Sequence, residues 1–158
     1  MHSAGVHGVE GYAGSAVQLK LLEKFASSTR GDDHPTVVLV HAVNPYGMAH
    51  FRRFNENNVD LNRNALTPSE WIGALSREPN IAGYFDIDET FNPPRPPTHL
   101  DAYLIIPFNS VRLIAKLGFT HVKRALVAAQ YSEKGGIFYG GRKMERSNQV
   151  RGRRARRN

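Results

Sequence analysis

Two pairs of residues in this sequence have types and spacing that could do chemistry. His7 and Glu10 stand three residues apart in a glycine-rich run near the N-terminus, and an imidazole nitrogen and a carboxylate oxygen are both good zinc ligands. Asn62 and Arg63 stand side by side further along the chain. A guanidinium can bind a carboxylate through two charge-assisted hydrogen bonds, and a neighbouring amide can add a third. The alternative for each pair is a polar loop in water.

Secondary-structure elements must position these pairs, and the apolar pattern predicts several of them. Apolar residues recur at helical spacing from Tyr12 to about Ser27, which predicts a helix just after the first pair. The apolar, β-branched run Thr36–Val43 is typical of a buried strand in a parallel sheet. Asn44–Gly47 predicts a turn. Residues 48–66 are polar, and we expect a loop there with a short strand at Val59–Leu61.

The second half of the chain mixes helical and irregular patterns. Thr67 precedes a proline and is the expected N-cap of a short helix. The prolines within residues 92–97 require an extended backbone. Residues 100–117 carry apolar positions at helical spacing despite a proline, and Phe119–Tyr131 should continue as a helix followed by a strand or loop. Ile137–Tyr139, which stands between glycines, suits a short strand or hairpin.

Composition places the chain among globular proteins and limits its possible metal ligands. Its 158 residues suit one domain, and its hydrophobic fraction of 41% and charged fraction of 22% are ordinary for a folded protein. Since the chain has no Cys, a zinc site must use His, Glu or Asp. No apolar run approaches about eighteen residues and no signal peptide is visible, so we expect a cytoplasmic protein with no membrane partner.

The net charge of +7 arises entirely at the C-terminal end. Residues 142–158 contain eight Lys and Arg against one acid, whereas residues 1–141 are balanced. Because a nucleic-acid-binding fold usually spreads basic residues over a folded face, the body of the chain predicts no specific nucleic-acid partner. We expect a domain over residues 1–148 and a disordered Arg-rich tail over residues 149–158, since the tail has little apolar surface to bury.

The motifs and their order resemble the zinc carboxypeptidase superfamily. Gly5–Val17 and Asn44–Asn64 are most similar to a bacterial branch known mainly as a domain of unknown function, and the resemblance extends over about residues 3–149. It implies an α/β fold built on a mixed, mostly parallel sheet flanked by helices, incomplete in this chain. It also implies Zn²⁺ as the cofactor and hydrolysis of an amide next to a free carboxylate, in a peptide or N-acyl amino acid-like substrate.

The resemblance also implies roles for particular residues. His7 and Glu10 match the first two zinc ligands, and Asn62–Arg63 match the pair that holds the terminal carboxylate of the substrate. Arg52 or Arg53 matches the arginine that polarises the scissile carbonyl. Stabilising the charge that develops on that oxygen is commonly a large catalytic contribution. The sequence leaves open which of the two arginines faces the site.

Two parts of that family's site have no match in the sequence. The third zinc ligand should be a His on a later strand, the general base should be a late Glu, and zinc catalysis needs three protein ligands. The residues without the matching context are His2, His34, His41, His50, His99, His121, Glu133 and Glu145. We therefore expect a truncated gene product with weak or absent zinc binding and little or no hydrolysis.

Two other interpretations stay open, so the sequence leaves undecided whether the chain is an enzyme. One is a non-catalytic truncated fragment. The other is a binding module that acts through the basic tail, whose arginines between residues 151 and 157 would bind nucleic acid or an acidic surface nonspecifically and in a salt-sensitive way.

Overall fold

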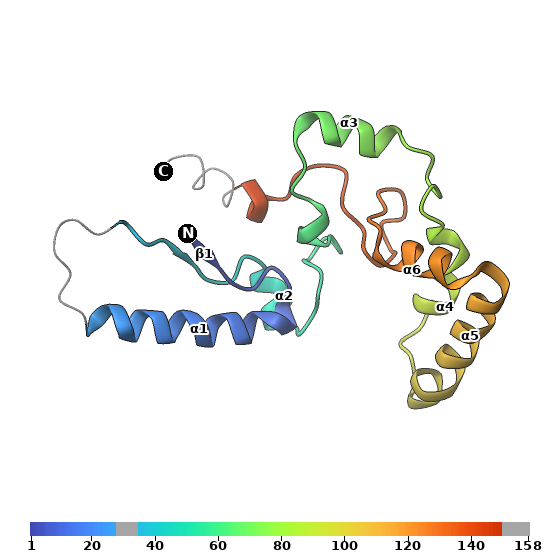
Figure 1. Cartoon of the computed structure of the whole chain (residues 1–158), viewed down its shortest axis with the longest axis horizontal. Helices are drawn as coiled ribbons and strands as arrows, with labels where there is room; N and C mark the ends of the chain where they lie inside the picture. Colours follow the sequence, from blue (N-terminus) through green and yellow to red (C-terminus); the bar gives the residue numbers. More distant parts are fainter. Residues whose placement is uncertain (28–34, 150–158) are drawn as a thin grey trace. The chain divides into compact units, whose positions relative to one another are not determined.

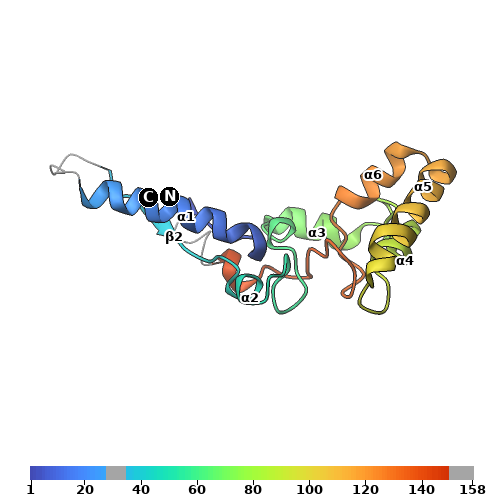
Figure 2. The ribbon, with the colours of Figure 1, turned by 90° about the horizontal axis from the view of Figure 1, so that it is seen from below.

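The computed structural model describes residues 1–27 and 35–149, which divide into two compact units. The first unit combines Met1–Ala65 with the segment that begins at Lys143, and the second unit is Leu66–Arg142. The chain thus leaves the first unit and later returns to it. Figures 1 and 2 show the ribbon from two sides, with α1 to α6 labelled in both views.

The first unit is built on two short strands and a long helix. β1 (His2–Ser3) pairs in parallel with β2 (Leu39–Val40). α1 (Gly8–Ala26) runs alongside both strands (Figure 1). The buried side chain of Gln18 donates a hydrogen bond from α1 to the Val40 carbonyl oxygen over 3.0 Å. This contact ties the helix to the second strand.

A short helix follows the second strand, where the sequence predicted a turn. This helix, α2 (Pro45–Ala49), has Asn44 as its N-cap. The Asn44 side-chain oxygen accepts a hydrogen bond from the backbone N–H of Gly47 over 2.8 Å, and its amide nitrogen donates to the Arg53 carbonyl oxygen over 3.2 Å. Because Asn44 is buried and bonded on both sides, it joins α2 to the segment that follows.

The strand predicted at Val59–Leu61 is wrong, because a 3-10 helix, η1 (Leu61–Arg63), begins there. Asp60 precedes η1 as its N-cap, and its carboxylate accepts a hydrogen bond from the backbone N–H of Asn62 over 2.9 Å. This local bond competes with strand formation, as Asp side chains commonly do. Asn62 and Arg63, the candidate carboxylate-binding pair, therefore lie on a tight helical turn.

The second unit begins with the helix expected after Thr67. α3 (Pro68–Ser76) has a complete capping box, in which the side chains of Thr67 and Glu70 each accept from the other's backbone N–H. The 3-10 helix η2 (Tyr84–Asp86) and α4 (Asp88–Phe91) follow. The prediction of Thr67 as N-cap is confirmed. The sequence could predict it because a cap depends on residues that are neighbours in sequence.

The predicted helix over residues 100–117 is also present. It starts as a π-helix, η3 (Asp101–Ile105), and continues as α5 (Ile106–Leu117), with Pro107 in the first turn of α5. A wider turn before a proline relieves the clash that the ring would otherwise make. α6 (Phe119–Val127) follows. The core that these helices share is centred on Ile87, Val122 and Ala125.

The fold is mostly helical with a small two-stranded parallel sheet, so it is α/β only in a loose sense. In the described part, the strand predicted over Thr36–Val43 covers Leu39–Val40. The strand or hairpin predicted at Ile137–Tyr139 is reduced to a parallel bridge between Gln130 and Tyr139. Apart from Gln149, the predicted Arg-rich tail lies outside the described residues.

Within residues 1–27 and 35–149, no single helix is long and apolar enough to cross a membrane. The continuous helix Asp101–Leu117 and the helix Phe119–Val127 reach the required length and composition only when taken together, and they are bent by 117° at the break between them.

Candidate metal and carboxylate site

His7 is held at the start of α1 by close packing of the backbone beside it. It is the N-cap of the helix, and its side chain is buried. The backbone N–H of Gly8 donates to the Arg52 carbonyl oxygen over 3.0 Å. A Cβ on Gly8 would lie 1.9 Å from the Gly47 carbonyl oxygen, so only glycine allows this approach. The glycine-rich run therefore serves to seat the helix start against the Gly47–Arg52 segment.

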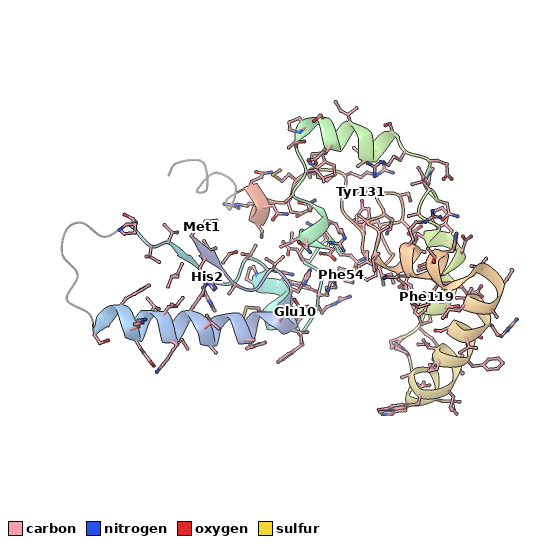
Figure 3. The ribbon with its side chains drawn as sticks, viewed as in Figure 1. Met1, His2, Glu10, Phe54, Phe119 and Tyr131 are labelled. Atoms are coloured by element: carbon pink, nitrogen blue, oxygen red, sulfur yellow. The ribbon has the colours of Figure 1, made fainter. Side chains whose placement is uncertain are left out.

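The two ring nitrogens of His7 face two different carboxylates. Nδ1 lies 3.1 Å from Oε2 of Glu10, whose side chain is largely exposed. Figure 3 shows Glu10 at the N-terminal end of α1. Nε2 lies 3.0 Å from Oδ1 of Asp60, whose side chain is fully buried. The imidazole thus joins a buried carboxylate to one that faces water.

Asp60 lies at the centre of this arrangement. Besides facing His7, it accepts a hydrogen bond from Nε of Arg53 over 3.0 Å and one from the backbone N–H of Asn62 over 2.9 Å. An ionised carboxylate is an acceptor only, so in the tautomer of His7 that bonds to an ionised Asp60 the hydrogen is on Nε2. In the neutral form of that tautomer, Nδ1 presents a lone pair toward Glu10.

A lone pair on Nδ1 and an ionised Glu10 would be two acceptors facing each other over 3.1 Å. Such a pair is favourable only when a proton or a metal cation lies between the two atoms. Two ligands at zinc distances of about 2.1 Å in a tetrahedral site lie about 3.4 Å apart. The 3.1 Å separation of His7 and Glu10 is that of a hydrogen bond. It is also close to the spacing of two ligands of one zinc ion, for which Asp60 would be the outer partner that orients the imidazole.

In the described part of the chain, this arrangement lacks a third zinc ligand. Among residues 1–27 and 35–149, no group of three or more His, Cys, Asp or Glu could hold a metal ion. Asp60 does not complete the set, because it faces the ring nitrogen opposite to the one that Glu10 faces. The pair fits zinc as a partial site.

Of the two candidate arginines, it is Arg53 that points into the cluster. Its Nε bonds to Asp60, and its Nη1 lies 3.8 Å from Oε1 of Glu10. The Arg52 side chain is exposed, and its backbone makes the contacts, accepting from Gly8 and donating to Gly47. Arg53 thus contributes its side chain to the cluster, and Arg52 contributes its backbone to the helix start.

Asn62 and Arg63 lie on η1, directly after Asp60. The Asn62 side chain is exposed, and Nη1 of Arg63 donates to the Asn62 carbonyl oxygen over 3.4 Å. The buried residue Asn64 fixes the end of the turn: its side chain donates to the Lys143 carbonyl oxygen over 2.8 Å and accepts from the Glu145 backbone N–H over 2.7 Å. The segment that begins at Lys143 thus holds the turn that carries Asn62 and Arg63.

Sequence reasoning missed Asp60, Asn64 and Asn148 as parts of this site. Asn148 is buried and donates to the Leu61 carbonyl oxygen over 2.9 Å. The signal for Asp60 was its place two residues before Asn62, within the same motif. Asn148 offered no such signal, because its partners lie more than eighty residues away in sequence.

His121, one of the histidines without the matching context of a third ligand, lies in the second unit. Nε2 of His121 is 2.8 Å from Oδ2 of Asp86, and Arg124 lies 3.4 Å from the other ring nitrogen. His121 is thus bonded to Asp86 and Arg124 near the start of α6.

A mostly helical chain with a small parallel sheet carries a His–Glu pair, an orienting Asp and an Asn–Arg turn, and these features define a protein with a candidate metal and carboxylate site. Comparison with protein families places it more closely. The family described as "Protein of unknown function (DUF2817)" matches residues 1–155, and the chain belongs to that family. No curated protein and no solved structure matched the chain.

Proposed function

We propose that this chain derives from the zinc carboxypeptidase superfamily and carries the first half of its site. The observation that carries the proposal is the environment of His7. Buried Asp60 holds one ring nitrogen, while the other lies 3.1 Å from Glu10, at a spacing that fits two ligands of one zinc ion. On this proposal, β1 and β2 belong to a mixed, mostly parallel sheet of the carboxypeptidase type.

The proposed substrate is a peptide or an N-acyl amino acid with a free carboxylate. Asn62 and Arg63 would bind the carboxylate, and a guanidinium gives such a group a two-point, charge-assisted contact. Arg53 would stabilise negative charge on the carbonyl oxygen next to the scissile bond. Zinc, when bound, would polarise that carbonyl and a water molecule.

We further propose that the chain binds zinc weakly and hydrolyses little substrate. Catalytic zinc sites use three protein ligands and keep one position open. The residues described here bring together two ligands, His7 and Glu10. Two ligands hold the ion less tightly than three, and the family's general base has no counterpart in this cluster.

Zinc titration of the full chain by calorimetry tests the metal half of this proposal. We expect one weak site that His7→Gln and Glu10→Gln each abolish. The exposed His99 supplies a matched control, because His99→Gln should leave the site intact. Zinc that survives a chelator would show that a further ligand exists, and equal zinc uptake by the His7→Gln variant would overturn the assignment.

The carboxylate half is tested with a ligand pair that differs in one group. N-acetylphenylalanine has a free carboxylate, and N-acetylphenylalaninamide does not. We expect the chain to bind the acid more tightly, and Arg63→Gln to remove that preference while Arg52→Gln keeps it. Equal binding of the two ligands by the unchanged chain would refute the carboxylate role of Asn62 and Arg63.

A further inference from the structure

The continuous helix of η3 and α5 carries an exposed apolar stripe. Leu104, Phe108 and Val111 follow one another at spacings of four and three residues, which places them on one side of a helix. Their exposed fractions are 62%, 64% and 66%. A contiguous group of large apolar side chains on an exposed face is typical of an interaction surface.

This stripe is separate from the side of α5 that packs into the second unit. Leu113 and Leu117 contact the core of Ile87, Val122 and Ala125. Phe108 and Val111 lie on other positions of the helical turn and face water. α5 is therefore apolar on two sides, and its own unit covers one of them.

Basic residues accompany the stripe without acids among them. Residues 102–132 contain no Asp or Glu. Within them, Arg112 and Lys116 of α5 are exposed and follow Phe108 by one and two helical turns, and α6 adds Lys123 and Arg124, also exposed. Glu89 of α4 lines the same groove as Arg112 and Lys116, and Asp86 bonds to His121 beside Arg124, so these two acids offset part of this charge. The surface remains cationic beside the apolar stripe.

We propose that α5 and α6 bind the surface of an anionic membrane, with Leu104, Phe108 and Val111 inserted at the boundary between headgroups and acyl chains. A helix that has an apolar face flanked by Lys and Arg lies in the interface plane of a bilayer. Basic residues near anionic lipids each strengthen such binding. A dimer through this face is disfavoured, because the basic residues of the two copies would repel each other.

This inference departs from the sequence-based expectation of no membrane partner, for a physical reason. That expectation depended on the length needed to span a bilayer. A helix that lies on a bilayer needs no such length, because its backbone hydrogen bonds are internal and only one face leaves water. The bend between α5 and α6 is compatible with lying flat.

Flotation of the full chain with lipid vesicles tests the proposal. Vesicles of phosphatidylcholine are compared with vesicles in which about one third of the lipid is phosphatidylserine, an anionic lipid. We expect binding to the mixed vesicles, weakened by salt. Phe108→Ser should lower the partition about tenfold, the equivalent of roughly 1.4 kcal/mol. Arg112→Gln should lower it about fivefold, the effect of roughly one basic residue at such a surface.

Two controls separate this face from the rest of the chain. The Arg-rich tail is intact in Phe108→Ser, so charge alone does not produce the expected loss. Ile72 on α3 is 72% exposed, and Ile72→Ser removes an equally exposed apolar side chain outside the cationic run. It should bind like the unchanged chain.

Several outcomes would overturn the proposal. Equal flotation of Phe108→Ser and the unchanged chain would assign the binding to another segment. Absence of flotation with either kind of vesicle would remove the membrane partner altogether. A dimer in solution that Phe108→Ser converts to a monomer, without vesicle binding, would make this face a contact between copies.

Discussion

Replacing the buried carboxylate of Asp60 by an amide is the sharpest perturbation of the candidate site. Asp60→Asn keeps the shape of the side chain and removes its charge. The native carboxylate faces Nε2 of His7 and accepts from Nε of Arg53, both over 3.0 Å, and from the Asn62 backbone N–H. An amide has one oxygen for these partners, and its NH₂ group must face His7 or Arg53.

The expected loss of stability follows from the burial of these groups. Removing one partner of a buried ion pair costs about 3–5 kcal/mol. The Arg53 side chain is 34% exposed, whereas that of Asp60 is fully buried, so water can replace part of what Arg53 loses. We therefore expect the lower end, about 3 kcal/mol of unfolding free energy. Because Asp60 orients His7, zinc affinity should also fall about 10–100-fold.

Urea unfolding followed by far-UV circular dichroism measures the first effect, with a chelator present so that zinc does not contribute. Calorimetric titration with zinc measures the second. The exposed Glu56 lies in the same loop, and Glu56→Gln makes the same chemical change as a control. If Asp60→Asn and Glu56→Gln unfold at the same urea concentration and bind zinc equally, the reasoning about His7 fails.

Three further predictions concern the backbone and the ion pairs. Gly8→Ala should lower the unfolding free energy by about 3 kcal/mol in urea, because overpacking against backbone cannot be relieved, whereas Gly73→Ala, with no atom within 4 Å of its Cβ, should be neutral or stabilising. Thr67→Ala should cost about 1 kcal/mol by thermal unfolding, since it removes the capping box; an unchanged midpoint would contradict this. The hydrogen bond from Arg95 and those from the turn before η3 lower the pKa of Asp101. Stability from Asp101 is therefore present above its ordinary pKa of about 4 and lost as pH falls below it, and Asp101→Asn should flatten that acid limb of a pH-dependent unfolding series.

Local sequence signals predicted the helices well and the strands poorly. The helix after Tyr12, the helix over residues 100–117 and the cap at Thr67 are all present. Periodicity and capping depend on neighbours within one or two turns. A strand depends on its partner, and of the predicted strand Thr36–Val43 the residues that form β2 are Leu39–Val40.

The candidate site shows the same division between local and distant information. The pairing of His7 with Glu10 follows from their spacing and is present. The sequence did not decide whether Arg52 or Arg53 faces the cluster. Two adjacent arginines are alike in the sequence, and only the backbone conformation sets the direction of each side chain. Arg53 faces Asp60 through its side chain, whereas Arg52 bonds to Gly8 through its backbone.

The sequence by itself determined the family-like motifs, the lack of Cys, the location of the basic charge and the residue types that could hold zinc and a carboxylate. Tertiary structure decided which groups meet. It placed Asp60 behind His7 across fifty-three residues and Asn148 against Leu61 across eighty-seven. Such contacts form only when closing a long loop is compensated by burial of its partners, and no pattern in neighbouring residues specifies which loop closes.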